Sequence, residues 1–225
     1  MTQESRTEEP RTQESRSQES LGFIHRFEPG TGAARPLLLL HGTGGNELDL
    51  LPLGRIVAPG AALLSPRGPV SENGMPRFFR RLAEGVFDEA DLRRRTGDLA
   101  AFVAAARGRY GLGAPLALGF SNGANIAASL LMLWPEVLAG AVLIRPMVPL
   151  SEPPMADLAG RPVLILSGAM DPIVPAENAR RLAAQLTASG AAVAHRILPV
   201  GHGLSQGDLS LAADWVRGLA LPNAA

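Results

Sequence analysis

One serine stands in a setting that could make it a nucleophile. Ser121 is the centre of Gly119-Phe120-Ser121-Asn122-Gly123, which follows an apolar run at residues 114–118 and precedes a helix-prone run that begins at Ala124. A strand, a tight turn and a helix in this order would expose the serine hydroxyl above the edge of a sheet. The helix behind it would aim unpaired N–H groups at negative charge forming near that hydroxyl. Ser121 is therefore a candidate nucleophile.

A serine hydroxyl needs a base within hydrogen-bond reach, and the sequence holds four histidines. His25 and His195 fall inside strand patterns, where we interpret His25 as an edge or surface residue and His195 as structural. His41 precedes a glycine-rich turn that it would help to shape. His202 lies in a loop, residues 199–203, between the last expected strand and the last expected helix. Because this loop lets an imidazole approach the serine from above the sheet, His202 is the expected base.

The base in turn needs a carboxylate that orients it. Asp171 comes just after the apolar run at residues 163–166, so it would lie at the same sheet edge as Ser121. Asp157 precedes that run and would lie at the opposite edge. Asp208 and Asp214 belong to the last expected helix, where Asp208 is interpreted as a first-turn acid that complements the helix dipole. Asp171 is therefore the expected orienting acid.

Acyl transfer also needs two N–H donors for the oxyanion of the tetrahedral intermediate. The backbone amide of Asn122, directly after the serine, is one expected donor. The second is expected from the turn His41-Gly42-Thr43-Gly44-Gly45-Asn46, with Thr43 as the donor residue. Its glycines would let the backbone fold inward.

The elements that must position these residues alternate along the chain. Continuous apolar runs, typical of strands covered on both faces, occur at residues 37–40, 61–65, 115–120, 141–144 and 163–166, with a mixed run at 193–198 and an alternating outer strand at 23–27. Helical spacing of apolar residues occurs at 88–110, 176–189 and 209–219. This alternation predicts an α/β domain with a mainly parallel, twisted sheet and helices on both faces. Residues 66–87 fit neither pattern, and we weigh a lid or pocket wall against an ordinary packed excursion.

Composition bounds the function classes. The chain has 225 residues, 46% apolar and 19% charged, with 21 basic and 21 acidic residues and no cysteine. Zero net charge disfavours nucleic-acid partners, and the lack of cysteine excludes disulfides and thiolate metal sites. No run is apolar and long enough for membrane insertion.

The first segment differs from the rest in composition. Residues 1–20 repeat Gln-Glu-Ser-Arg and have no apolar residue after Met1, which predicts a disordered low-complexity tail ahead of an α/β domain at 21–225. The tail lacks the apolar core of a signal peptide, so we expect a cytoplasmic protein.

With these motifs in place, the chain resembles the carboxylesterase/phospholipase branch of the α/β-hydrolases. That branch includes the acyl-protein thioesterases and bacterial small-ester hydrolases. The resemblance spans roughly residues 21–221, with motifs at residues 39–47, 119–123, 143–149, 171–175 and 201–204 and the order Ser121, Asp171, His202. Acyl-protein thioesterases typically carry Gln where this chain has Asn122, and Asp where it has Asn46. The resemblance therefore implies a cofactor-free hydrolase of small carboxylic esters, nearer to the bacterial enzymes, and often a homodimer.

The expected reaction is a two-step acyl transfer through an acyl-enzyme, with a small ester as the partner and no metal. Expected pocket walls, each weighed against a place in the core, are Phe78, Phe79, Met147, Ile173 and Leu204. A thioesterase or lactonase using the same triad is the alternative within enzymes. A non-catalytic α/β-hydrolase scaffold that binds a small molecule or a partner is the alternative outside them.

Overall fold

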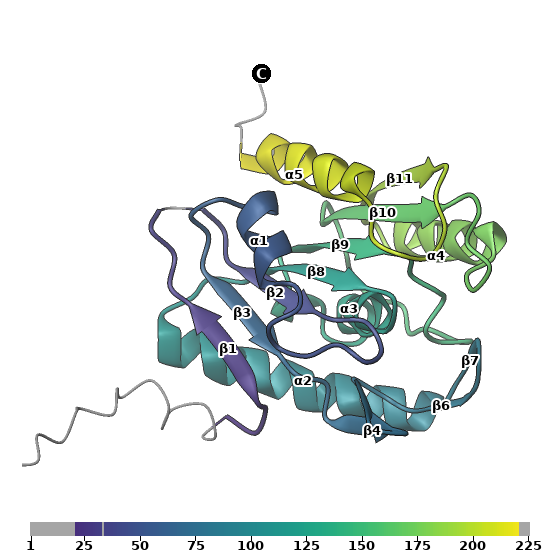
Figure 1. Ribbon diagram of the computed structural model, residues 1–225, viewed down its shortest axis with the longest axis horizontal. Coiled ribbons are helices and arrows are strands. Elements are labelled where there is room, and N and C mark those ends of the chain that lie inside the picture. Colours follow the sequence, from purple (N-terminus) through teal and green to yellow (C-terminus); the bar gives the residue numbers. More distant parts are fainter. Residues whose placement is uncertain (1–20, 33, 221–225) are drawn as a thin grey trace, which may run out of the picture.

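A seven-stranded sheet forms the centre of the computed structural model, which describes residues 21–32 and 34–220 (Figure 1). Across the sheet the order is β1-β3-β2-β8-β9-β10-β11, and only β1 runs antiparallel to its neighbour. The strands are β1 (His25–Glu28), β2 (Leu37–Leu40), β3 (Leu63–Pro66), β8 (Leu116–Phe120), β9 (Gly140–Ile144), β10 (Pro162–Gly168) and β11 (Ala192–Leu198). The predicted tail at residues 1–20 lies outside the described residues.

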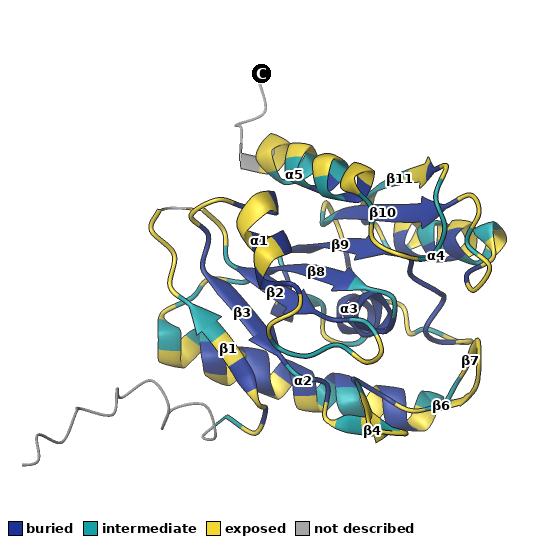
Figure 2. Ribbon diagram, in the orientation of Figure 1, coloured by how far each residue is buried: buried dark blue, intermediate teal, exposed yellow. Residues whose placement is uncertain are grey.

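The continuous apolar runs form strands that are buried on both faces. In β2 all four leucines are buried, and successive side chains point to opposite faces of the sheet. Leu38 and Leu40 join one core cluster, whereas Leu37 and Leu39 join a second cluster on the other face. Figure 2 shows the inner strands β3, β2, β8, β9 and β10 as almost entirely buried. This is the burial expected of a parallel sheet packed between two layers of helices.

Helices supply both outer layers (Figure 1). They are α1 (Leu51–Val57), α2 (Glu89–Tyr110), α3 (Asn122–Leu133), α4 (Ala176–Ala188) and α5 (Gln206–Ala220), with a short 3₁₀ turn, η2 (Pro135–Val137). Side chains of α2, α3 and α4 pack in the first core cluster, and those of α1 and α5 pack in the second. The α/β prediction with helices on both faces is confirmed. The seven-residue helix α1 was not predicted, because it is too short for a clear helical period.

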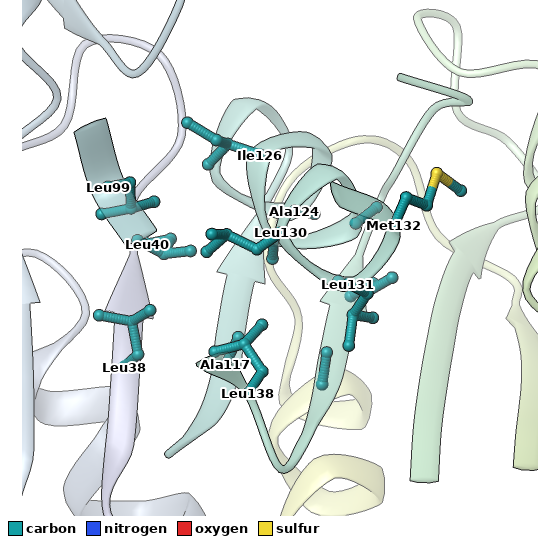
Figure 3. Packing of buried hydrophobic residues seen from close by; sticks show 14 of the residues in the cluster. Leu38, Leu40, Leu99, Ala117, Ala124, Ile126, Leu130, Leu131, Met132 and Leu138 are labelled. Atoms are coloured by element: carbon teal, nitrogen blue, oxygen red, sulfur yellow. The ribbon is translucent and has the colours of Figure 1, made fainter. Parts of the chain in front are cut away.

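Local sequence signals explain where the long helix α2 begins and ends. The side chain of Asp88 accepts a hydrogen bond from the amide of Asp91 at 3.0 Å, so Asp88 is the N-cap of the helix. Gly111 ends the helix in the left-handed conformation with φ of 66°. Figure 3 shows the core that forms where α3 crosses the sheet, with Leu130 lying close to Leu40 of β2.

Residues 66–87 are more regular than the sequence indicated. They form two small antiparallel hairpins, β4 (Val70–Glu72) with β5 (Met75–Arg77) and β6 (Arg81–Ala83) with β7 (Val86–Phe87). Asn73 and Gly74 connect β4 to β5 with φ values of 51° and 82°. Positive φ at both central residues is the requirement of a two-residue hairpin turn, and an Asn-Gly pair is its strongest sequence signal. That dipeptide could have predicted the first hairpin.

Candidate active site

Ser121 occupies the sharp turn between β8 and α3. Its backbone has φ of 52° and ψ of −114°, a conformation that few residues other than glycine adopt. The turn is held by a hydrogen bond from the Ser121 amide to the carbonyl of Ile144 on β9, at 2.8 Å. The Ser121 carbonyl then accepts the first helical hydrogen bond, from Asn125 at 3.0 Å. The turn thus fixes the hydroxyl at the carboxyl-terminal edge of the sheet.

The two glycines of the motif are required by close backbone contacts. A Cβ atom on Gly119 would lie 2.6 Å from the carbonyl oxygen of Gly123. A Cβ atom on Gly123 would lie 1.9 Å from the carbonyl oxygen of Leu40 on β2. Both distances are far below van der Waals contact, so a larger residue at either position would push the turn away from the sheet.

The structure brings Ser121, His202 and Asp171 into one hydrogen-bonded chain. His202 Nε2 lies 3.0 Å from Ser121 Oγ, and His202 Nδ1 lies 2.8 Å from Asp171 Oδ2. An ionised carboxylate can only accept, so Nδ1 carries the proton and Nε2 is left to accept from the serine hydroxyl. The Phe120 ring packs beside the imidazole, with centroids 5.5 Å apart. This arrangement can withdraw a proton from Ser121.

The loop after β10 keeps Asp171 ionised. The Asp171 side chain is 1% exposed, compared with 20% for His202. Burial alone would raise the pKa of Asp171, but hydrogen bonds from the Val174 amide, from His202 and from the Ile173 amide outweigh it and lower the pKa below its ordinary value. The amides of Ile173 and Val174 reach Asp171 Oδ1 at 2.8 and 3.0 Å, leaving Oδ2 for the imidazole.

The two expected oxyanion donors lie at the same cavity as the serine. Thr43 and Asn122 both line it together with Ser121. Within the described residues, neither backbone amide has a hydrogen-bond acceptor. The Thr43 side chain is held by Arg77, whose Nη1 donates to Thr43 Oγ1 at 2.9 Å. The geometry leaves both amides open to a ligand oxygen.

His41 shapes the turn that carries Thr43. Its ring is buried, with Nε2 accepting from the Gly68 amide at 2.9 Å and Nδ1 lying 2.7 Å from the carbonyl of Gly42. Both contacts suit a neutral imidazole, and burial lowers the pKa of His41. His195 contacts the hydroxyl of Ser167 at 2.9 Å. His25 lies on the edge strand β1, one of the two expected placements, but it is buried and contacts Tyr110 at 2.9 Å instead of facing solvent.

Sequence reasoning missed Arg145, which fastens the loop that carries His202. Arg145 Nε donates to the carbonyl of Gly201 at 3.0 Å, and Nη2 donates to the carbonyl of Gly203 at 3.3 Å. Arg145 Nη1 donates to the carbonyl of Leu166 at 3.2 Å, and bidentate hydrogen bonds join Arg145 to Asp208, both at 2.8 Å; the side chains of Arg145 and Asp208 are fully buried. Asp208 lies in the first turn of α5, as expected, and it is in addition the internal counter-ion of Arg145. An arginine enclosed by the apolar run at residues 141–150 was the available signal.

The cavity above Ser121 is small, about 40 Å³. Of the five expected pocket walls, Met147 and Ile173 line it. Phe78 and Phe79 do not, because both rings are fully buried in the core, against His41 and Phe87 respectively.

The remaining expected wall, Leu204, is exposed on the His202 loop and does not line the cavity either. A larger cavity of about 480 Å³ lies between α1 and α5, where Val57 and Val216 line it together with Leu116, at the amino-terminal end of β8. It is at the sheet edge opposite to Ser121.

The described part of the chain holds neither a metal-binding cluster nor a membrane-spanning helix. Across residues 21–32 and 34–220, no three His, Cys, Asp or Glu side chains are grouped so that they could hold a metal ion. None of the helices described is long and apolar enough to cross a membrane.

The chain is similar to proteins described as hydrolases and carboxylesterases. No family model matches the chain. The provisionally named hydrolase MhqD of Bacillus subtilis (strain 168) is 49% identical over 195 residues, which cover 86% of this chain and 97% of MhqD. A Bacillus cereus carboxylesterase structure is 46% identical with a TM-score of 0.89, covering 92% of this chain and 99% of its own. The structure of YahD with malic acid is 28% identical with a TM-score of 0.82, covering 86% and 97%.

Proposed function

The chain belongs to the carboxylesterase branch of the α/β-hydrolases, and from that premise we propose that it hydrolyses small carboxylic esters through an acyl-enzyme on Ser121. The observation that carries the proposal is the hydrogen-bonded chain from Ser121 through His202 to Asp171. Its members arrive from separate loops at the carboxyl-terminal edge of the sheet, where such folds bind ligands.

In the first step His202 Nε2 takes the proton of Ser121 as Oγ bonds to the ester carbonyl carbon. The carbonyl oxygen becomes an oxyanion, which accepts hydrogen bonds from the amides of Thr43 and Asn122. The intermediate collapses when the bond to the alkoxy oxygen breaks and His202 returns the proton to the leaving alcohol. Asp171 stabilises the imidazolium and fixes its tautomer.

In the second step a water molecule attacks the acyl-enzyme. His202 takes one proton from the water, and the new oxyanion occupies the same site. The bond to Ser121 Oγ then breaks, the serine regains its proton from His202, and the carboxylic acid leaves. Every proton that His202 accepts is returned, so the cycle needs no cofactor.

The cavity size supports short acyl groups. A cavity of about 40 Å³ holds on the order of three waters, since each needs roughly 10–15 Å³. Long acyl chains would require the hairpins at residues 70–87 to move. The malic acid in the YahD structure is a small carboxylic acid, the type of product that we propose for this chain.

The test is covalent labelling with a fluorophosphonate probe, combined with turnover of 4-nitrophenyl acetate. The wild type should label and turn over, and Ser121→Ala should lose both while keeping its circular dichroism spectrum. The matched control is Ser167→Ala, which removes another serine hydroxyl that contacts a histidine ring and should retain both. Wild-type protein that does not label would contradict the proposal. Matched oxygen and sulfur esters then distinguish an esterase from a thioesterase.

A further inference from the structure

Two arginines in the cavity wall share a single counter-ion. Arg77 and Arg81 both line the cavity beside Ser121. Glu72 lies 3.0 Å from Arg77 Nη1 and 2.9 Å from Arg81 Nε. Two guanidinium groups against one carboxylate leave one positive charge uncompensated. The Arg77 side chain is 4% exposed and that of Arg81 is 29% exposed, so solvent screens this charge only in part.

The same wall holds hydrogen-bond donors that are not used. Arg77 donates to Phe79 and Thr43 through Nε and Nη1, and its Nη2 has no acceptor within the described residues. Arg81 uses only Nε in that part of the chain. The side-chain amide of Asn122 is buried, and its Nδ2 has no acceptor there either, since only Oδ1 is engaged, by the Phe78 amide. A buried donor normally has a partner, so the Asn122 amide indicates a ligand that brings acceptors, and the guanidinium nitrogens beside it are further donors for that ligand.

The third arginine in the wall acts differently. All five N–H groups of Arg145 are directed at protein acceptors, and Asp208 neutralises its charge. Arg145 therefore has no capacity left for a ligand. One acid, Glu84, also lines the cavity. It is exposed on the turn between β6 and β7, where water weakens its effect on Arg77 and Arg81.

We propose, on the basis of the esterase function above, that the acyl group of the substrate carries a carboxylate, as in monoesters of short dicarboxylic acids. The ester carbonyl lies at Ser121, and the remote carboxylate accepts hydrogen bonds from the free guanidinium nitrogens of Arg81 and Arg77. Arginine suits this role because its planar fork matches a carboxylate. The small cavity limits the carbon chain between the two groups to a few atoms.

The experiment compares kcat/KM for monomethyl succinate and methyl butyrate, whose acyl groups have equal carbon numbers and differ in the terminal carboxylate. Wild-type enzyme should favour monomethyl succinate by about tenfold or more, because a charge-assisted hydrogen bond contributes enough for that factor. Arg81→Gln should remove most of this preference. Glu72→Gln should increase it, because both guanidinium groups are then released from their shared carboxylate.

Arg80→Gln is the matched control. Arg80 is next to Arg81 in the chain, but it is exposed, pairs with Asp88 at 2.6 Å and does not line the cavity. It should keep the wild-type preference. A wild type that hydrolyses methyl butyrate at least as well as monomethyl succinate would overturn the inference and leave the esterase function standing. Failure to hydrolyse either ester, with no fluorophosphonate labelling, would instead refute the esterase function and the inference with it.

Discussion

Asp208→Ala would remove the carboxylate that pairs with the fully buried guanidinium group of Arg145. Arg145 and Asp208 are both 0% exposed, and two hydrogen bonds of 2.8 Å join them. Removing one partner of a buried ion pair typically lowers the free energy of unfolding by about 3–5 kcal/mol, because the other charge stays buried without compensation. We expect a loss in that range.

The contacts of Asp208 give a similar magnitude. Its carboxylate also accepts from the amide and the hydroxyl of Ser205, at 2.9 and 2.7 Å. In the alanine variant, two N–H groups of Arg145 lose their acceptors, and each unsatisfied buried donor costs about 1–3 kcal/mol. Because domains of this kind have about 5–15 kcal/mol of stability, the variant should still fold at room temperature.

The assay is guanidinium chloride unfolding, with Asp214→Ala as the matched control. Asp214 is on the same helix and pairs with Arg217 at 3.0 Å, but both side chains are largely exposed. Exposed pairs contribute less than about 1 kcal/mol, so the control should unfold near the wild-type midpoint. A loss for Asp208→Ala no larger than that of Asp214→Ala would refute the assignment of a buried, structurally required pair.

The same variant also tests catalysis. Arg145 holds the carbonyls of Gly201 and Gly203, which flank His202. If the pair positions the imidazole, folded Asp208→Ala should lose kcat with a smaller change in KM. Arg145→Lys, which keeps the charge but not the fork, should show the same pattern. Unchanged kcat in both folded variants would show that the loop is held by other contacts.

Three further predictions concern the turn, the acid and His41. Gly123→Ala should give unfolded or inactive protein, because the new Cβ would lie 1.9 Å from the carbonyl oxygen of Leu40. The control is Gly108→Ala on α2, where the new Cβ meets no atom within 4 Å, and this variant should raise the free energy of unfolding by about 0.5–1 kcal/mol. Asp171→Asn should lower kcat by about 10⁴-fold with the fold intact, because the amide cannot hold the required tautomer. The pKa of His41 is lowered in the folded state, so below about pH 6.5 the unfolded chain binds a proton at His41 more readily than the folded protein does. The contribution of His41 to the free energy of unfolding should therefore be complete above that pH and decline below it. Denaturant unfolding at several pH values measures this decline. His41→Gln should flatten this decline in part, and His195, whose pKa burial also lowers, contributes to the remainder.

The features predicted from sequence were those that local patterns determine. The leucine run of β2, the apolar spacing along α2 and the glycine-flanked turn at Ser121 each carry their own signal, because each pattern arises within a short stretch of the chain. His202 could be chosen by elimination, since the chain has only four histidines. These local signals together predicted the α/β fold and a candidate triad whose three members form one hydrogen-bonded chain in the structure.

The features that were missed depend on contacts between distant residues. Arg145 and Asp208 are 63 residues apart, and no local pattern links an arginine after one strand to an acid at the start of the last helix. Phe78 and Phe79 lie in a segment near the cavity, yet both rings turn into the core. The direction of a side chain in an irregular segment depends on the surfaces around it, and those surfaces exist only in the folded chain.

The backbone conformation that Ser121 needs for catalysis lowers the stability of the folded protein. A residue held at φ of 52° and ψ of −114° carries strain on the order of 1–3 kcal/mol, which glycine would relieve. Selection of random variants for heat resistance alone should therefore enrich Ser121→Gly, and the survivors would be folded, long-lived and inert. Selection for turnover should hold the serine in place and gather its stabilising substitutions elsewhere. The nucleophile is thus the position where these two selections should separate first.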